Sequence, residues 1–114
     1  MLRILATLLF TSLAGAAAAQ GCSEIRFAPG AFAGEVSGRV SQRQPLCFTF
    51  GSGAGQQARV QVFGSNNVCF NLRGVADCRD DFVFRTRKQT YVIDVNQLFA
   101  GPGHETFTLR LTIR

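Results

Sequence analysis

The last nine residues of the chain, "TFTLRLTIR" at positions 106–114, alternate strictly between polar and apolar side chains. The apolar positions are Phe107, Leu109, Leu111 and Ile113. Threonine or arginine holds every position between and around them. Because successive side chains of a β-strand point to opposite faces, this period of two predicts a strand with one buried face and one solvated face.

The same alternation recurs upstream in seven segments: residues 25–27, 36–40, 48–50, 58–62, 68–73, 82–85 and 91–95. Glycine-rich and proline-containing turns separate them, and the only place for a short helix is around residues 96–100. About eight short strands predict a sandwich or a barrel. The many phenylalanines at the apolar positions favour a phenylalanine-rich core between two sheets. We therefore expect an all-β, antiparallel, jelly-roll-like β-sandwich with two disulfides.

The N-terminus has the order of a secretory signal: a basic start with Arg3, an apolar run over residues 4–13 and a small-residue stretch over residues 14–19. We expect cleavage after residue 19, which makes residues 1–19 a signal peptide and residues 20–114 a single periplasmic or secreted domain. The apolar run is shorter than the roughly 20 residues that a spanning helix needs, so no membrane span is expected. A buried N-terminal helix and a lipoprotein acylated at Cys22 remain as alternatives.

The chain is basic, with a formal net charge of +5 that falls to +4 when Arg3 is removed. A solvated surface accounts for most such excess charge, and the alternative is contact with an acidic protein or glycan of the cell envelope. No nucleic acid partner is expected. The candidate binding cluster comprises Arg73, Arg79, Arg85, Arg87 and Lys88, which would gather at one end of the sandwich if their strands are neighbours.

The four cysteines are Cys22, Cys47, Cys69 and Cys78. An even number of cysteines in a small exported chain is typical of a disulfide framework. No C-x-x-C pair is present, so the spacing favours neither zinc nor a redox pair, and no metal site is predicted. Three pairings are possible. We expect Cys69 to pair with Cys78 across a hairpin, which leaves Cys22 to pair with Cys47.

The sequence offers no catalytic constellation. The single histidine, His104, lies in a glycine-rich loop without an identifiable acid or nucleophile beside it. No nucleophile elbow, phosphate-binding loop or zincin helix is present. We therefore expect a noncatalytic protein with no cofactor.

A group of three carboxylates, Asp77, Asp80 and Asp81, leaves two alternatives open. Oxygen ligands of this kind can hold Ca²⁺. The neighbouring Arg73 and Arg79 can instead neutralise them and form a salt-linked loop, which is the interpretation we favour.

Four segments carry a family resemblance: "GEVSGRV" (34–40), "CFTFGSGAGQQARVQV" (47–62), "TYVIDVNQ" (90–97) and "TFTLRLTI" (106–113). They resemble bacterial pre-peptidase C-terminal β-sandwich domains, in which an aromatic strand leads through an Ala-Gly-Gln turn into an alternating strand. Here that turn is Ala54-Gly55-Gln56, and Thr90-Tyr91 opens the later Tyr-x-Ile-x-Val strand, with Gln89 in place of the usual glycine. The resemblance implies a noncatalytic domain that binds, solubilises or assists folding.

The same segments are similar to periplasmic inhibitors of goose-type lysozyme. In that family, arginines after the Tyr-x-Ile-x-Val strand enter the lysozyme cleft. The corresponding stretch here, residues 96–101, reads "NQLFAG" and contains no arginine, so no inhibitory residue is transferred. We expect an exported noncatalytic binding or accessory protein of the cell envelope, with a lysozyme-inhibitor-like protein as the alternative.

Overall fold

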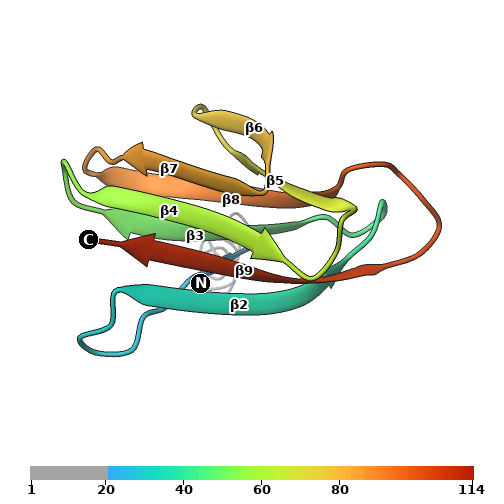
Figure 1. Ribbon diagram of the computed structural model, residues 1–114, viewed down its shortest axis with the longest axis horizontal. Helices are drawn as coiled ribbons and strands as arrows, with labels where there is room; N and C mark the ends of the chain where they lie inside the picture. Colours follow the sequence, from blue (N-terminus) through green and yellow to red (C-terminus); the bar gives the residue numbers. More distant parts are fainter. Residues whose placement is uncertain (1–20) are drawn as a thin grey trace, which may run out of the picture.

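The computed structural model describes residues 21–114, which form two β-sheets packed face to face (Figure 1). The nine strands are β1 (Cys22–Glu24), β2 (Ala33–Val40), β3 (Leu46–Ser52), β4 (Gln57–Phe63), β5 (Val68–Leu72), β6 (Ala76–Arg79), β7 (Asp81–Arg85), β8 (Gln89–Gln97) and β9 (Glu105–Ile113). The expected signal peptide, residues 1–19, lies outside the described residues.

One sheet has five strands in the order β1-β3-β8-β5-β6, and the other has four in the order β2-β9-β4-β7. The predicted all-β sandwich with two disulfides is confirmed. Three details differ: β1 lies at Cys22–Glu24 and pairs in parallel with β3, β6 is an additional strand, and residues 96–100 form no helix. Within residues 21–114, no helix is long and apolar enough to cross a membrane.

The apolar side of the sequence alternation forms the core. Leu109 and Leu111 of β9 and Ile93 of β8 are fully buried between the sheets. Aromatic pairs join the two layers. Phe84 of β7 meets Tyr91 of β8 edge to face at 5.2 Å between ring centroids. Such a pair contributes roughly 0.5–1.5 kcal/mol beyond the burial of its area.

The prediction of a phenylalanine-rich core is correct only in part. Phe48, Phe50, Phe70 and Phe107 are buried, whereas Phe32, Phe63 and Phe99 are 65%, 41% and 74% exposed. The exposed three stand just before a strand, at the end of a strand and in a loop, respectively. Phe63 lies on the outer face of β4, as its alternation with the buried Val62 predicts, whereas Phe32 and Phe99 lie outside the strands, where no alternation applies.

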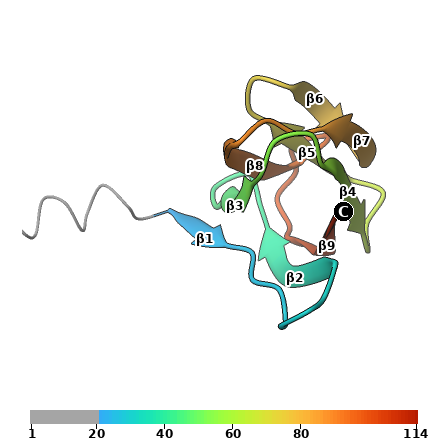
Figure 2. The same ribbon diagram turned by 90° about the vertical axis from the view of Figure 1, so that its left-hand side faces the viewer.

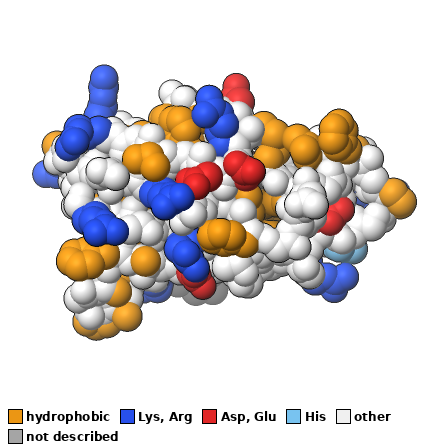
Figure 3. All heavy atoms as spheres, in the orientation of Figure 1, with side chains coloured by type: hydrophobic (Ala, Val, Ile, Leu, Met, Phe, Trp, Pro, Cys, Tyr) orange, Lys and Arg blue, Asp and Glu red, His pale blue; other side chains and the backbone are white. Residues whose placement is uncertain are grey.

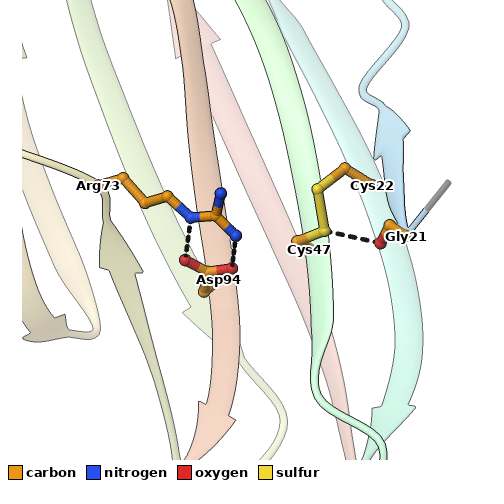
Figure 4. The surroundings of a disulfide bond; sticks show 5 residues. All are labelled: Gly21, Cys22, Cys47, Arg73 and Asp94. Carbon is orange, nitrogen blue, oxygen red and sulfur yellow. Dashed lines mark hydrogen bonds and ion pairs between the residues drawn. A yellow bond between two sulfur atoms is a disulfide. The ribbon is translucent and has the colours of Figure 1, made fainter. Parts of the chain in front are cut away.

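The disulfides join Cys22 to Cys47 and Cys69 to Cys78, the pairs expected from the sequence. Cys22 and Cys47 are register partners on β1 and β3, with Cα atoms 4.6 Å apart (Figure 4). The Sγ atom of Cys47 also lies 2.6 Å from the carbonyl oxygen of Gly21. Because a disulfide sulfur carries no proton, we treat this as a close contact and not as a hydrogen bond.

Most connecting segments lie at the two ends of the sandwich (Figure 1), and Figure 2 views it from one of these ends. We call one end the loop end, formed by loops 41–45, 64–67 and 98–104. We call the opposite end the basic end, formed by segment 26–32 and by turns 53–56 and 86–88. The β5–β6 turn, residues 73–75, is an exception and lies over the middle of the five-stranded sheet.

Candidate functional site

The structure separates two residues of the predicted basic cluster from the rest. Arg73 forms a bidentate ion pair with Asp94 on the outer face of the five-stranded sheet, with Nε–Oδ2 and Nη2–Oδ1 distances of 2.7 and 2.8 Å (Figure 4). Arg79 stacks its guanidinium over the ring of Phe82, at 5.1 Å from the centroid. Arg73 and Arg79 thus contact neighbouring side chains away from the two ends of the sandwich.

The other three cations of the predicted cluster lie together. Arg85 is the last residue of β7, and Arg87 and Lys88 follow in the turn to β8. All three are exposed at the basic end. The Arg85 guanidinium donates a hydrogen bond to the Gly55 carbonyl oxygen at 3.0 Å, which ties the β7 end to the β3–β4 turn.

The predicted salt-linked loop of Asp77, Asp80 and Asp81 with Arg73 and Arg79 is wrong. The physical reason is register, because β7 pairs with β4 and brings Asp81 beside a different arginine. Neither of the other two aspartates forms an ion pair within the described residues. In that part of the chain no three Asp, Glu, His or Cys side chains lie close enough to hold a metal ion.

The actual partner of Asp81 is Arg59 of β4. Its Nε and Nη2 atoms lie 2.9 and 2.6 Å from Oδ1 and Oδ2 of the carboxylate. These hydrogen bonds hold the pKa of Asp81 below its ordinary value, since they favour the charged form. The pair is exposed, so it contributes little to stability.

The loop end is built around Asn67, which holds the 98–104 loop in place. Its Nδ2 donates to the carbonyl oxygen of Phe99 at 3.0 Å and to Oε2 of Glu105 at 3.1 Å. In return, the Phe99 N–H donates to Oδ1 of Asn67 at 2.8 Å. The Leu98 N–H donates to the backbone oxygen of Asn67 at 2.9 Å. One side chain therefore fixes both sides of the Phe99 peptide.

Two further contacts support the same loop. Ser65 Oγ donates to Oε1 of Glu105 at 2.7 Å. This bond and the one from Asn67 lower the pKa of Glu105, so the carboxylate is charged at neutral pH. At the base of the loop, Gln97 Nε2 donates to the Gly103 carbonyl oxygen at 3.0 Å. The loop is thus held at several points before any partner arrives.

The held loop presents apolar side chains to solvent. Phe99 and Leu98 are 74% and 45% exposed. Other residues of the same loop, His104 among them, line an open hollow of about 490 Å³ between loops 41–45 and 98–104, whose lining also includes Arg43. No carboxylate lines this hollow, so His104 has no acidic partner there. The chemistry suits binding: an aromatic tip beside a basic hollow.

Sequence reasoning missed Asn67 and Arg43. They lie on loops far from residues 98–104 in the chain, and nothing in their spacing connects them. The one local signal was the exposed apolar pair in "NQLFAG", which breaks the alternation of the preceding strand. That signal marks a loop with apolar side chains but does not reveal its partners.

The fold is similar to that of several solved proteins. The PliG of Aeromonas hydrophila, a periplasmic lysozyme inhibitor of g-type lysozyme, superposes with a TM-score of 0.70 and 21% identity, over 82% of this chain and 96% of that one. The PliG of Salmonella Typhimurium gives 0.66 and 14%, over 82% and 97%. The pre-peptidase C-terminal domain of a Bacillus anthracis collagenase gives 0.56 and 11%, over 82% and 94%.

At these identities the likeness shows the fold alone. No family model matches the chain, and no curated protein matches it in sequence. The resemblance to both the pre-peptidase C-terminal and the lysozyme-inhibitor sandwiches is confirmed as a shared fold.

Proposed function

We propose that this chain is an exported, noncatalytic β-sandwich protein that binds a protein partner through its loop end, and that g-type lysozyme is the partner to test first. The alignment covers nearly the whole of the similar inhibitor chains, 96% and 97% of their lengths. The two disulfides fit an oxidising compartment outside the cytoplasm. The signal-like N-terminal sequence supports export.

The observation that carries the proposal is the prearranged 98–104 loop with its exposed tip. Ordering a flexible loop on binding lowers affinity, and a loop that is already fixed avoids much of that entropy cost. Phe99 is exposed although it is large and apolar, so burial against a partner would be favourable. Aromatic side chains at the centre of an interface often dominate its binding energy.

Arg43 extends this surface with a positive charge. The resemblance to the inhibitor family implies arginines after the Tyr-x-Ile-x-Val part of β8, and residues 96–101 of this chain contain none. Arg43 reaches the hollow from a different loop, next to His104. An acidic cleft in the partner would therefore meet an apolar tip and an arginine, although the two come from separate segments.

The experiment measures inhibition of a g-type lysozyme by residues 20–114 with both disulfides formed. We expect inhibition by the wild-type chain and a loss of about tenfold or more in apparent affinity for Phe99→Ala, since a buried aromatic contact is worth about 1.4 kcal/mol or more. Phe32→Ala is the matched control, because it removes an equally exposed ring at the opposite end. The proposal would be refuted if the wild-type chain neither inhibited nor bound the lysozyme at micromolar concentration. It would also be refuted if the two variants had equal effects.

A further inference from the structure

An open groove lies at the basic end, between segment 26–32 and the end of β3. Its volume is about 780 Å³. The lining includes Phe27, Phe32, Gly51, Gly53 and Gln56. Hydrophobic and basic side chains gather at the corresponding left-hand end of the molecule in Figure 3. The groove is thus partly apolar and has cations nearby, and it is far from the loop end.

One wall of the groove is a free strand edge. β1 pairs with only Cys47–Thr49 of β3, and the last rung is the hydrogen bond from the Ile25 N–H to the Thr49 oxygen at 2.9 Å. Beyond it, β3 continues through Gly51 and is paired on its other side with β8. Backbone groups of alternate residues point to the same side of a strand, so those of Gly51, like those of Thr49, face away from β8.

Space at this edge is sufficient for another backbone. Gly51 lines the open groove itself, and a Cβ atom placed on it would meet nothing within 4 Å, so the sheet face above this residue is also open. Gly51 is also exposed, and no further hydrogen bond joins it to the described N-terminal segment. Within the part of the chain that the structure describes, this edge is unpaired, and an unpaired strand edge can be extended by a peptide strand.

The charge beside the edge is not neutralised. Arg85, Arg87 and Lys88 form no ion pair within residues 21–114. Segments 26–32, 50–56 and 85–88 contain no aspartate or glutamate. Ser52 Oγ donates to the Arg87 carbonyl oxygen at 2.6 Å, so the cationic turn is attached directly to the end of β3. Among the described residues the basic side chain that lines the groove is Arg114, and Arg87 and Lys88 lie across the end of β3 on its β8 side. Negative charge near the end of a bound strand would be attracted by all three.

We propose that this groove binds an extended acidic peptide segment of a protein partner. The peptide backbone pairs with the Gly51 edge of β3, an apolar side chain lies against Phe27 and Phe32, and carboxylates face Arg87 and Lys88. A glycan or a lipid headgroup would use the charge but would leave the strand edge unpaired. The groove is independent of the loop end, so this site can be correct whether or not the chain binds lysozyme.

The test measures binding of a fluorescent acidic peptide of alternating Glu and Val residues to residues 20–114. We expect saturable binding that weakens about tenfold or more as salt rises from about 50 to about 300 mM, because added ions screen exposed charges. The Arg87→Ser/Lys88→Ser double variant should bind at least about tenfold more weakly, since charge at the site attracts the peptide. Within residues 21–114 neither side chain forms a hydrogen bond or an ion pair, so the fold should be kept.

Three comparisons make the outcome decisive. Arg39→Ser/Arg43→Ser removes the same charge elsewhere and should bind the peptide like the wild type. A peptide with proline at alternate positions cannot donate to the strand edge and should bind poorly. The proposal would be overturned if the basic-end double variant bound the peptide as tightly as the wild type, or if the proline peptide bound as tightly as the original peptide. Binding of anionic vesicles or of an acidic polysaccharide in place of the peptide would also overturn it. Phe99→Ala should leave peptide binding unchanged, which separates this test from that of the lysozyme proposal.

Discussion

Replacing Asn67 by alanine should release the 98–104 loop without unfolding the sandwich. The change removes three side-chain hydrogen bonds, two with the Phe99 peptide and one with the charged Glu105 carboxylate. A typical hydrogen bond contributes about 0.5–1.5 kcal/mol, and one to a charged group more. Water can reach these partly buried groups once the loop opens, so we expect a total near the lower limit, about 2 kcal/mol. That free energy corresponds to an increase of about 30-fold in the open population of the loop.

Amide hydrogen exchange of Leu98 reports this opening. Its N–H is bonded to the backbone oxygen of Asn67, which the substitution leaves in place. Exchange at Leu98 should accelerate about 30-fold in Asn67→Ala, because exchange follows local opening. The amide of Ile93, in the buried part of β8, should change much less.

Asn66→Ala is the matched control, since Asn66 is an exposed neighbour whose side chain forms no hydrogen bond in the described part of the chain. It should leave Leu98 exchange unchanged. A wild-type exchange rate at Leu98 in Asn67→Ala would show that the loop is held by other contacts. Equal acceleration at Leu98 and Ile93 would show a global effect and would refute the local mechanism.

Three further predictions concern the disulfide bonds, a turn and pH. Replacing Cys69 and Cys78 by alanine should lower the free energy of unfolding in urea by about 2.7 kcal/mol in the chain-entropy model. Replacing Cys22 and Cys47 should lower it more, by about 3.5 kcal/mol, because the Cys22–Cys47 bond closes a longer loop. A larger loss from the Cys69/Cys78 replacement would contradict this prediction. Gly64→Ala should destabilise the domain by more than about 1 kcal/mol in the same assay, because φ is +107° and the new Cβ would lie 3.0 Å from the Thr106 oxygen. Acid should loosen the 98–104 loop. The folded pKa of Glu105 is depressed, so its stabilisation is present above its ordinary pKa of 4.5 and is lost as pH falls through the folded value. Loop-amide protection, corrected for intrinsic exchange, should therefore fall below about pH 4.5 in the wild type but not in Glu105→Gln.

Most of the fold could be predicted because its signals are local. The alternation in residues 106–114 needs only neighbouring side chains, and the cysteine pairs follow from a hairpin and from elimination. The strand β6 was missed because Ala76 is its only buried residue and no alternation marks it. It forms because the chain returns to pair with β5 beside the Cys69–Cys78 bond.

The candidate sites depend on contacts that are distant in sequence. Asn67 reaches residues 98–104 only because β4, β5, β8 and β9 end or begin at the same edge of the sandwich (Figure 1). Arg43 arrives from a third loop. Loops carry little periodic pattern, so single-sequence reasoning has no means to bring three of them together. The sequence could identify residues that interrupt the alternation of a strand, but not the surface that these residues form together.

Strand register also decides where unbalanced charge remains. Glu35 lies opposite Arg110, and their side chains pair at 2.6 Å. Asp81 at the start of β7 pairs with Arg59 of β4, and Asp94 of β8 pairs with Arg73 of the β5–β6 turn. Arg87 and Lys88 lie in a turn, where no strand places a carboxylate beside them. The net positive charge is therefore concentrated at the basic end, because arginines on the sheet faces are paired with acids and the basic residues in the 86–88 turn are not. A change that moved an acid into the 86–88 turn, such as Lys88→Glu, should therefore abolish acidic-peptide binding while leaving the pairs on the sheet faces intact.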